Sequence, residues 1–185
     1  MYVSFVFLPG AILKLAKSDK AKLVDRKFVR RLQLAVTEVN GCAACSFQHT
    51  QMALQDGMSN DEISSFLSGA GDYTKPEEAK AIMFAQHFAD SRGLVEKSAY
   101  ETIEKEYGIN EASIILSSVQ MMMAGNIYGI PFSAFLSRLQ GKPYRKSSLF
   151  YELRMIVMGF VFLPLAVIHA SFRSLFGLEN KRFVK

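Results

Sequence analysis

Apolar residues recur every three or four positions along the middle of the chain, the spacing that is typical of amphipathic helices. Residues 28–39 show this spacing first, and Asn40-Gly41 then ends the helix, because a left-handed backbone is tolerated there. A second helix is predicted from Cys42, or its neighbour, to Leu54. No segment alternates with a sustained period of two, so the sequence predicts an all-α fold.

Helix-start signals follow these two helices. Ser59 and Glu62 have the spacing of a capping box, in which side chains bond the free backbone N–H groups of a first helical turn. Thr74 to Glu77 repeats the signal, with Pro76 near the first helical position. The helix that follows is expected to turn these apolar side chains inward: Ile82, Met83, Ala85 and Phe88.

Three further helices are predicted before residue 143. The first covers residues 98–107 and ends at Gly108. The second runs from about residue 111 to residue 128, and Pro131 starts the third, which closes near Gly141.

The ends of the chain differ from this middle. Residues 155–168 form an apolar run that is interrupted by Gly159 and Pro164. The five residues Phe-Val-Phe-Leu-Pro occur at positions 5–9 and again at positions 160–164. Both ends therefore carry the same kind of apolar element that ends in proline.

We divide the chain into an apolar and basic N-terminal arm (1–24), a helical domain (25–143) and an apolar and basic C-terminal helical extension (144–185). Each end is expected to pack against the body or against a neighbouring subunit. Attachment to a membrane interface is the second alternative. A membrane span is the third, because a span needs about 20 apolar residues and a proline kinks the helix.

Length and composition fit one folded domain with appended arms. Of the 185 residues, 50% are hydrophobic and 12% aromatic, which excludes a disordered chain. Two cysteines are too few for the disulfide framework of a small secreted domain. The apolar start lacks a cationic segment and a small-residue cleavage site, so no secretory signal is predicted and a cytoplasmic location is expected.

The formal net charge of +5 is unevenly distributed. Residues 1–31 contain eight Lys and Arg against two acidic residues, and so do residues 142–185, whereas residues 32–141 contain six against thirteen. An acidic body speaks against binding of nucleic acid. The basic ends suit an anionic membrane surface or contacts between subunits.

Both cysteines of the chain lie in one Cys-x-x-Cys motif, at Cys42 and Cys45, with His49 four residues further on. On a helix these positions share a face, and three residues of rise, about 4.5 Å, is a separation that a disulfide can bridge. The free N–H groups and the dipole at a helix start stabilise a thiolate. His49 can accept the proton of Cys45, and Glu38 is a second candidate proton carrier.

Other roles for these residues stay open. A zinc site would need a fourth ligand besides Cys42, Cys45 and His49, whereas His87 and His169 lie in apolar segments and are expected to be packed side chains. The cysteines could also be small residues of the core. Redox chemistry is favoured over both roles because it accounts for the spacing of the sulfurs from His49.

The run Met121-Met122-Met123 also has two interpretations. Packing in the core or between subunits is favoured. A soft apolar lining for a hydroperoxide or a lipoyl-like substrate is the alternative, with Asn126 as a polar group in that pocket.

The stretch around the cysteines resembles the carboxymuconolactone decarboxylase-like superfamily and, within it, the alkylhydroperoxidase D-like branch, whose signature is Cys-x-x-Cys-x-x-x-His. The resemblance runs from about residue 28 to residue 140 and includes Asn40-Gly41 and the turn at Gly57. It implies an all-α bundle that forms a homo-oligomer, a dimer, trimer or hexamer. It also implies an enzyme that reduces hydroperoxides or exchanges disulfides.

By position in the motif, the resemblance makes Cys45 the attacking thiol, Cys42 the resolving thiol and His49 the proton relay. Two positions depart from the family. The usual glutamate twelve residues before the first cysteine is Arg30, and the residue before the second cysteine, often aromatic or histidine, is Ala44. These departures imply a thinner proton relay and a lower peroxidase efficiency.

The sequence-based hypothesis is therefore a thiol-dependent hydroperoxide reductase or disulfide oxidoreductase, in which Glu38 takes over the acidic role. It implies a hydroperoxide substrate and a dithiol reductant, either a protein or a lipoyl-like donor, and neither a cofactor nor a metal. The alternative is a redox-sensing oligomeric or membrane-associated scaffold without efficient turnover. Lactone decarboxylation is a weaker option, because that chemistry does not need two cysteines.

Overall fold

A computed structural model describes residues 1–21 and 23–184 of the chain. It confirms the all-α prediction, since no strand occurs among the described residues. The elements are α1 (Tyr2–Ala21), α2 (Arg26–Asn40), α3 (Ala43–Gln55), α4 (Asn60–Ser68), the short 3-10 helix η1 (Pro76–Glu78), α5 (Ala79–Asp90), α6 (Lys97–Leu139) and α7 (Leu149–Leu175).

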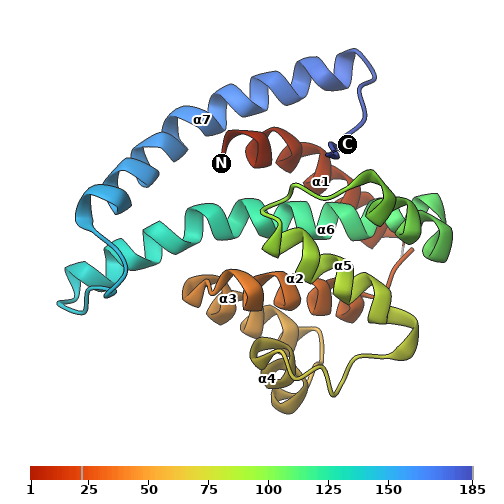
Figure 1. Cartoon of the computed structure of the whole chain (residues 1–185), viewed down its shortest axis with the longest axis horizontal. Coiled ribbons are helices and arrows are strands. Elements are labelled where there is room, and N and C mark those ends of the chain that lie inside the picture. Colours follow the sequence, from red (N-terminus) through yellow and green to blue (C-terminus); the bar gives the residue numbers. More distant parts are fainter. Residues whose placement is uncertain (22, 185) are drawn as a thin grey trace.

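The long helix α6 crosses the middle of the molecule and separates two groups of helices (Figure 1). Helices α2 to α5 pack on one side of α6 and make up the body. Helices α1 and α7 lie on the other side and contact each other as well as α6. The candidate site lies between these two groups.

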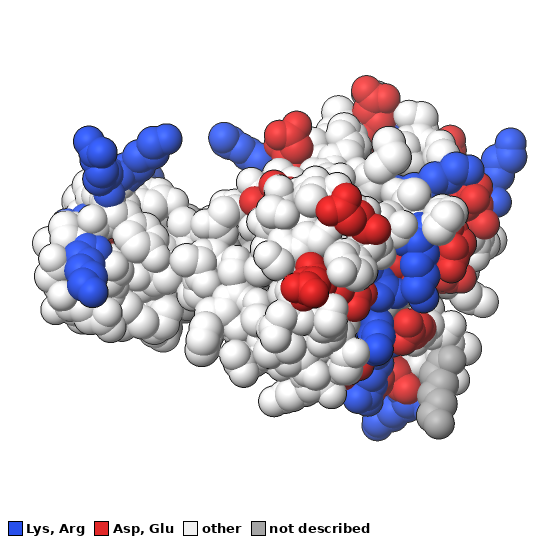
Figure 2. Space-filling view, turned by 90° about the horizontal axis from the view of Figure 1, so that it is seen from below, with Lys and Arg blue, Asp and Glu red and all other residues white. Residues whose placement is uncertain are grey.

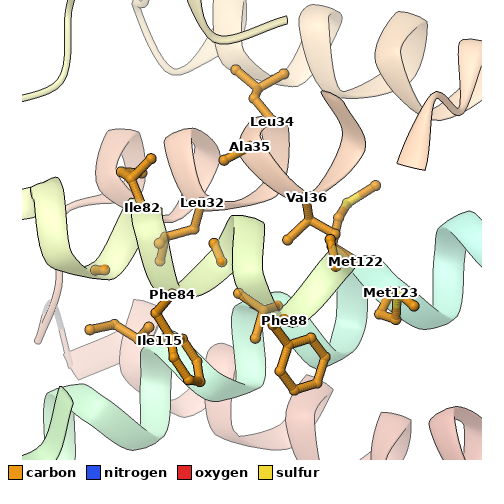
Figure 3. Packing of buried hydrophobic residues seen from close by; sticks show 14 of the residues in the cluster. Leu32, Leu34, Ala35, Val36, Ile82, Phe84, Phe88, Ile115, Met122 and Met123 are labelled. Carbon is orange, nitrogen blue, oxygen red and sulfur yellow. The ribbon is translucent and has the colours of Figure 1, made fainter. Parts of the chain in front are cut away.

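Helix α2 is the centre of the body. It contacts α3, α4, α5 and α6, and its residues 31–37 are buried without interruption. Leu32 and Val36 are fully buried and point toward α5 and α6, whereas Leu34, also fully buried, points to the opposite side of α2 (Figure 3). Each such side chain stabilises the fold by roughly 1.5–3 kcal/mol relative to an exposed one.

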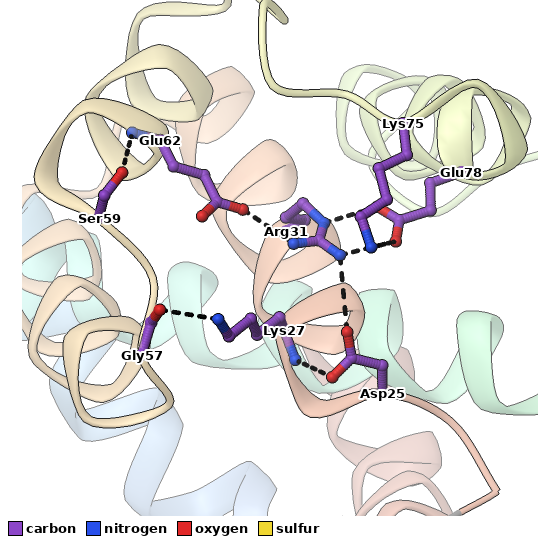
Figure 4. Close-up of polar contacts among 8 residues, drawn as sticks. All are labelled: Asp25, Lys27, Arg31, Gly57, Ser59, Glu62, Lys75 and Glu78. Carbon is purple, nitrogen blue, oxygen red and sulfur yellow. Dashed lines mark hydrogen bonds and ion pairs between the residues drawn. The ribbon is translucent and has the colours of Figure 1, made fainter.

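One charged residue, Arg31, lies within this core and is fully paired. Its Nε and Nη2 atoms donate to the two carboxylate oxygens of Glu78 at 2.6 Å each, and its Nη1 donates to Glu62 at 2.8 Å (Figure 4). A buried guanidinium is tolerated only with such partners, because removing it from water costs several kcal/mol. Arg31 thus ties α2 to α4 and η1.

The capping box expected at Ser59 forms only in part. The Ser59 hydroxyl accepts the backbone N–H of Glu62 at 3.1 Å, as predicted. The Glu62 carboxylate instead accepts from Arg31, so the core ion pair replaces the second bond of the box. The second helix-start signal leads into η1, and α5 begins three residues later.

The structure corrects the expected role of proline. Pro9, Pro131 and Pro164 lie inside α1, α6 and α7, so neither helix end nor helix start occurs at these positions. The backbone break at Gly108 was expected, and it appears as a kink within α6 with φ of 77° and ψ of 160°. Packing on both sides of Pro131, which is buried, outweighs the one backbone hydrogen bond that a proline removes.

Three side chains predicted to be packed are exposed. Met83 on α5 is 67% exposed, and His87 also faces solvent. His169 on α7 is exposed as well, and its Nδ1 lies 2.9 Å from the Tyr2 hydroxyl. Their apolar neighbours in the sequence therefore did not predict their surroundings.

Helices α1 and α7 bury little apolar surface. A small cluster formed by Phe5, Val6, Ala124 and Ala166 joins them to α6. In the first turn of α7, Glu152 accepts hydrogen bonds from Arg138 through both carboxylate oxygens, at 2.8 Å each. These bonds fix the α6–α7 hairpin. Helices α6 and α7 are both long and apolar enough to cross a membrane, but the apolar stretch of α6 is 61% buried and that of α7 only 11%.

Candidate redox site

The two cysteines lie where α2 passes into α3. Gly41 ends α2 with a left-handed backbone, φ of 66°, and its N–H bonds the carbonyls of Thr37 and Glu38. Cys42 then takes the N-cap position of α3, and its sulfur accepts the backbone N–H of Cys45 at 3.3 Å. The sulfur of Cys42 therefore faces free N–H groups, which favour negative charge on it.

Cys42 and Cys45 are joined by a disulfide, with Cα atoms 5.2 Å apart. The two sulfurs differ in access. Cys42 is completely buried, whereas Cys45 is 7% exposed and lines a pocket. A molecule in that pocket would meet Cys45 first.

Gly129 of α6 covers the disulfide from the other side. A Cβ atom at this position would lie 2.8 Å from the sulfur of Cys45 and 3.1 Å from that of Cys42. Gly125, one turn earlier, also lines the pocket but has no atom within 4 Å of such a Cβ. Only at residue 129 does the approach of α6 to α3 require glycine.

His49 lies on the same face of α3 as Cys45 and lines the same pocket. It is 9% exposed, and its Nδ1 has no hydrogen-bond partner among the described residues. Burial, and to a lesser degree the positive charge of Arg30, lower the pKa of His49 to about 4. The ring is thus neutral at pH 7, which disfavours the expected pairing of a charged imidazole with a thiolate.

Arg30, which replaces the glutamate usual in the family, bonds residues other than His49. Its Nε donates to Asp56 at 2.6 Å and its Nη1 donates to Gln33 at 2.9 Å. A guanidinium has no acceptor atom, so Arg30 cannot accept a proton from His49. The departure from the family at this position accordingly leaves His49 without the acidic neighbour that a glutamate would supply.

Glu38 is not brought to the sulfurs. Its carboxylate oxygen lies 3.3 Å from where a Cβ of Gly69 would be, at the end of α4, and Glu38 does not line the pocket. The four-residue spacing from Cys42 does not place the two on one helical face, because Gly41 ends the helix between them. Of the four predicted site residues, the structure brings together Cys42, Cys45 and His49.

The pocket has a volume of about 680 Å³ and is almost entirely apolar. Helices α1, α3, α6 and α7 all contribute to it. Its lining consists of Phe5, Leu8, Ala44, Cys45, Gln48, His49, Met121, Met122, Ala124, Gly125, Tyr128, Gly129, Phe132, Gly159, Phe160, Leu163 and Pro164.

Both Phe-Val-Phe-Leu-Pro segments contribute to this lining with their first and fourth residues. Phe5 and Leu8 come from α1, and Phe160 and Leu163 come from α7. The repeated sequence thus supplies two walls of one pocket.

The methionine run contributes both to the core and to the pocket lining. Met122 and Met123 are buried in the core, and Met121 and Met122 line the pocket. Asn126 is buried outside the pocket, where its amide donates to the carbonyl of Val36 at 3.5 Å. The alternative role of Asn126 as a polar group of the pocket is therefore wrong.

Sequence reasoning missed the glycines and aromatic residues of α6 and α7 that close the site. Gly125 and Gly129, four residues apart on one helix, were the available signal, since this spacing allows two backbones to approach closely. Tyr128 and Phe160 carried no comparable signal, because nothing in their own segments indicates that α7 folds back over α6.

Residues 9–87 match the family model described as "Carboxymuconolactone decarboxylase family". The match begins in α1, includes both cysteines and His49, and ends in α5, so the resemblance is confirmed for this part of the chain. Curated proteins and solved structures gave no match. The segment that carries the Cys42–Cys45 pair is thus similar to the carboxymuconolactone decarboxylase family.

Proposed function

We propose that this chain is a thiol-dependent oxidoreductase that reduces hydroperoxides (ROOH) whose organic group R is apolar. One observation carries the proposal: a disulfide lies at the wall of an apolar pocket of about 680 Å³, with only Cys45 facing the pocket. The family match supports this assignment, because it covers the residues of the pair.

The oxidative half of the cycle starts from the reduced pair. The Cys45 thiolate attacks the terminal oxygen of ROOH and the O–O bond breaks; with one proton this yields Cys45 sulfenic acid and the alcohol ROH. The Cys42 thiol then attacks the sulfenic sulfur, forms the disulfide and releases water. The partly exposed Cys45 suits the first step and the buried Cys42 suits the second.

The reductive half uses the difference between the two sulfurs. A thiolate of a dithiol donor attacks Cys45 from the pocket, and Cys42 leaves as a thiolate. The backbone N–H of Cys45, which already bonds the Cys42 sulfur, stabilises this leaving group. The second thiol of the donor then attacks the donor sulfur that is bound to Cys45, and Cys45 leaves as a thiolate, so that the donor departs as a disulfide and both cysteines are reduced.

His49 is the proton carrier of this proposal. Its neutral ring can take the Cys45 proton and deliver it to the alkoxide that leaves, but its low pKa makes it a weak base. Glu38 has no part in the route, because its carboxylate lies at Gly69.

Peroxide consumption by the reduced protein tests the assignment. We expect Cys45→Ser to abolish it and Cys42→Ser to accumulate a sulfenic acid that dimedone traps at Cys45. His49→Gln is expected to slow consumption roughly tenfold or more, whereas His87→Gln, an exposed histidine outside the pocket, leaves it unchanged. Full turnover by the Cys45→Ser protein would exclude the proposal.

A redox sensor without efficient turnover is the second candidate. The contact of Gly129 with both sulfurs favours it, since breaking the disulfide moves the sulfurs apart beneath α6. A sensor would be oxidised once by peroxide and change the packing of α6, but would not turn over with a dithiol donor. Steady-state peroxide consumption therefore separates the two candidates.

A further inference from the structure

Helix α7 exposes an apolar surface that the rest of the chain does not cover. The residues that face the protein form a narrow stripe with a spacing of seven, at Glu152, Gly159 and Ala166. The sides that face neither this stripe nor the pocket are exposed and apolar: Val157 is 55% exposed, Ile168 55% and Phe172 57%. A helix that is apolar on nearly all sides requires an apolar environment on the sides that its own protein leaves open.

The two residues that border the apolar stretch are basic, and the nearest acidic residues are Glu152, which is paired with Arg138, and Glu179 beyond the end of α7. The eighteen residues 155–172 contain no Lys, Arg, Asp or Glu, and they span about 27 Å of helix between Arg154 and Arg173. The hairpin before α7 adds three exposed basic residues, Lys142, Arg145 and Lys146, none of which has an ion-pair partner among residues 1–21 and 23–184. Basic side chains gather at the end of the lobe that this hairpin forms (Figure 2).

We propose that α7 and the α6–α7 hairpin form a surface that binds a bilayer containing anionic phospholipids. The exposed side of α7 enters the boundary of the acyl chains, and the basic residues at both ends meet the phosphate groups. This inference rests on the surface of α7 and does not depend on the proposed chemistry of the disulfide.

A bilayer fits this surface better than a second copy of the chain. Two copies of α7 that packed side by side would bring basic residues together in either orientation, because Arg154 and Arg173 lie at opposite ends of the apolar stretch. Exposed apolar residues also occur at neighbouring positions such as Phe160 and Val161. One partner helix would cover only part of such a surface, whereas hydrocarbon covers all of it.

Tryptophan fluorescence with brominated phospholipids tests the proposal, since the chain contains no tryptophan of its own. Val157→Trp places the probe on the side of α7 that lies outside the pocket, and Met83→Trp places a matched probe on α5, where the native side chain is 67% exposed. With vesicles of phosphatidylcholine and phosphatidylglycerol, we expect the emission of the first protein to fall at least twofold and that of the second to stay unchanged. Equal quenching of both probes, or of neither, would overturn the proposal.

Sedimentation with the same vesicles tests the basic hairpin. Lys146→Glu is expected to lower the partition coefficient about fivefold, while Lys105→Glu, an exposed lysine of the body, leaves it unchanged. Circular dichroism checks that both variants keep their helical content. If the native protein does not bind these vesicles and light scattering shows a dimer that Val157→Asp dissociates, a second copy of the chain covers α7 and the proposal is wrong.

Discussion

The body and helix α7 use similar apolar residues in opposite ways. In α2 a central run of buried residues is surrounded by four other helices, and the one charge within it is paired. In α7 the apolar residues are more numerous, yet only a narrow stripe contacts protein. The comparison teaches that apolar content alone does not decide whether a helix belongs to a core; the number of helices that pack around it does.

Removal of buried charge is expected to show the largest difference between the two regions. Arg31→Met leaves the carboxylates of Glu62 and Glu78 without their partner, which we expect to destabilise the fold by roughly 3–5 kcal/mol. Arg145→Met at the exposed hairpin is expected to change it by less than about 0.5 kcal/mol. Urea unfolding of both variants measures this, and equal losses would contradict the comparison.

Leucine truncation sharpens the comparison without a change of charge. Leu32→Ala opens a cavity in the core and is expected to cost roughly 2–5 kcal/mol. Leu165 on α7 is 51% exposed, so Leu165→Ala is expected to cost less than about 1 kcal/mol in the absence of lipid. A large loss at Leu165, read from the same unfolding curves, would mean that α7 is covered in solution.

The pocket between the two regions is expected to make stability depend on pH through His49. Because burial lowers its pKa to about 4, the folded state binds fewer protons than the unfolded state between pH 4 and 6.5. The stability is complete above pH 6.5 and falls as the pH drops toward 4, by up to about 3 kcal/mol. Chemical unfolding across this range should show the decline, and His49→Gln should remove it; a flat profile in the native protein would show that the ring is hydrated.

The smallest effects concern the two glycines of α6. Gly129→Ala pushes a methyl group against both sulfurs and is expected to destabilise the oxidised protein by roughly 1–3 kcal/mol. Gly125→Ala meets open space and is expected to stabilise the helix by about 0.5–1 kcal/mol. Thermal unfolding of the two variants tests whether α6 lies as close to α3 as described. Equal changes in their unfolding temperatures would contradict it.

Much of the body could be predicted because its signals are local. Ser59 caps α4, Gly41 ends α2 and Gly108 breaks the backbone, and each of these follows from the residue and its immediate neighbours. Proline misled the prediction, because local rules cannot show that packing around Pro131 and Pro164 continues the helix. The prediction that Met83 faces inward together with Ile82 is wrong, because adjacent residues of a helix face different directions.

The sequence predicted only those residues of the candidate site that lie on α3 or at its N-cap. Cys42, Cys45 and His49 lie close together because their spacing along α3 brings them together. The low pKa of His49 and the cover by Gly129 depend on α6 and α7, whose residues lie more than seventy positions away. Such contacts follow from tertiary packing, which the spacing of residues in one segment does not determine.

The burial of Cys42 and the cover of Gly129 leave Cys45 to be reached from one side. For the proposed enzyme, oxidant and electron donor would have to use the same entrance in turn. Turnover would then follow double-displacement kinetics, in which the alcohol departs before the donor enters. Reciprocal plots of rate against hydroperoxide concentration, at several fixed donor concentrations, would be parallel lines.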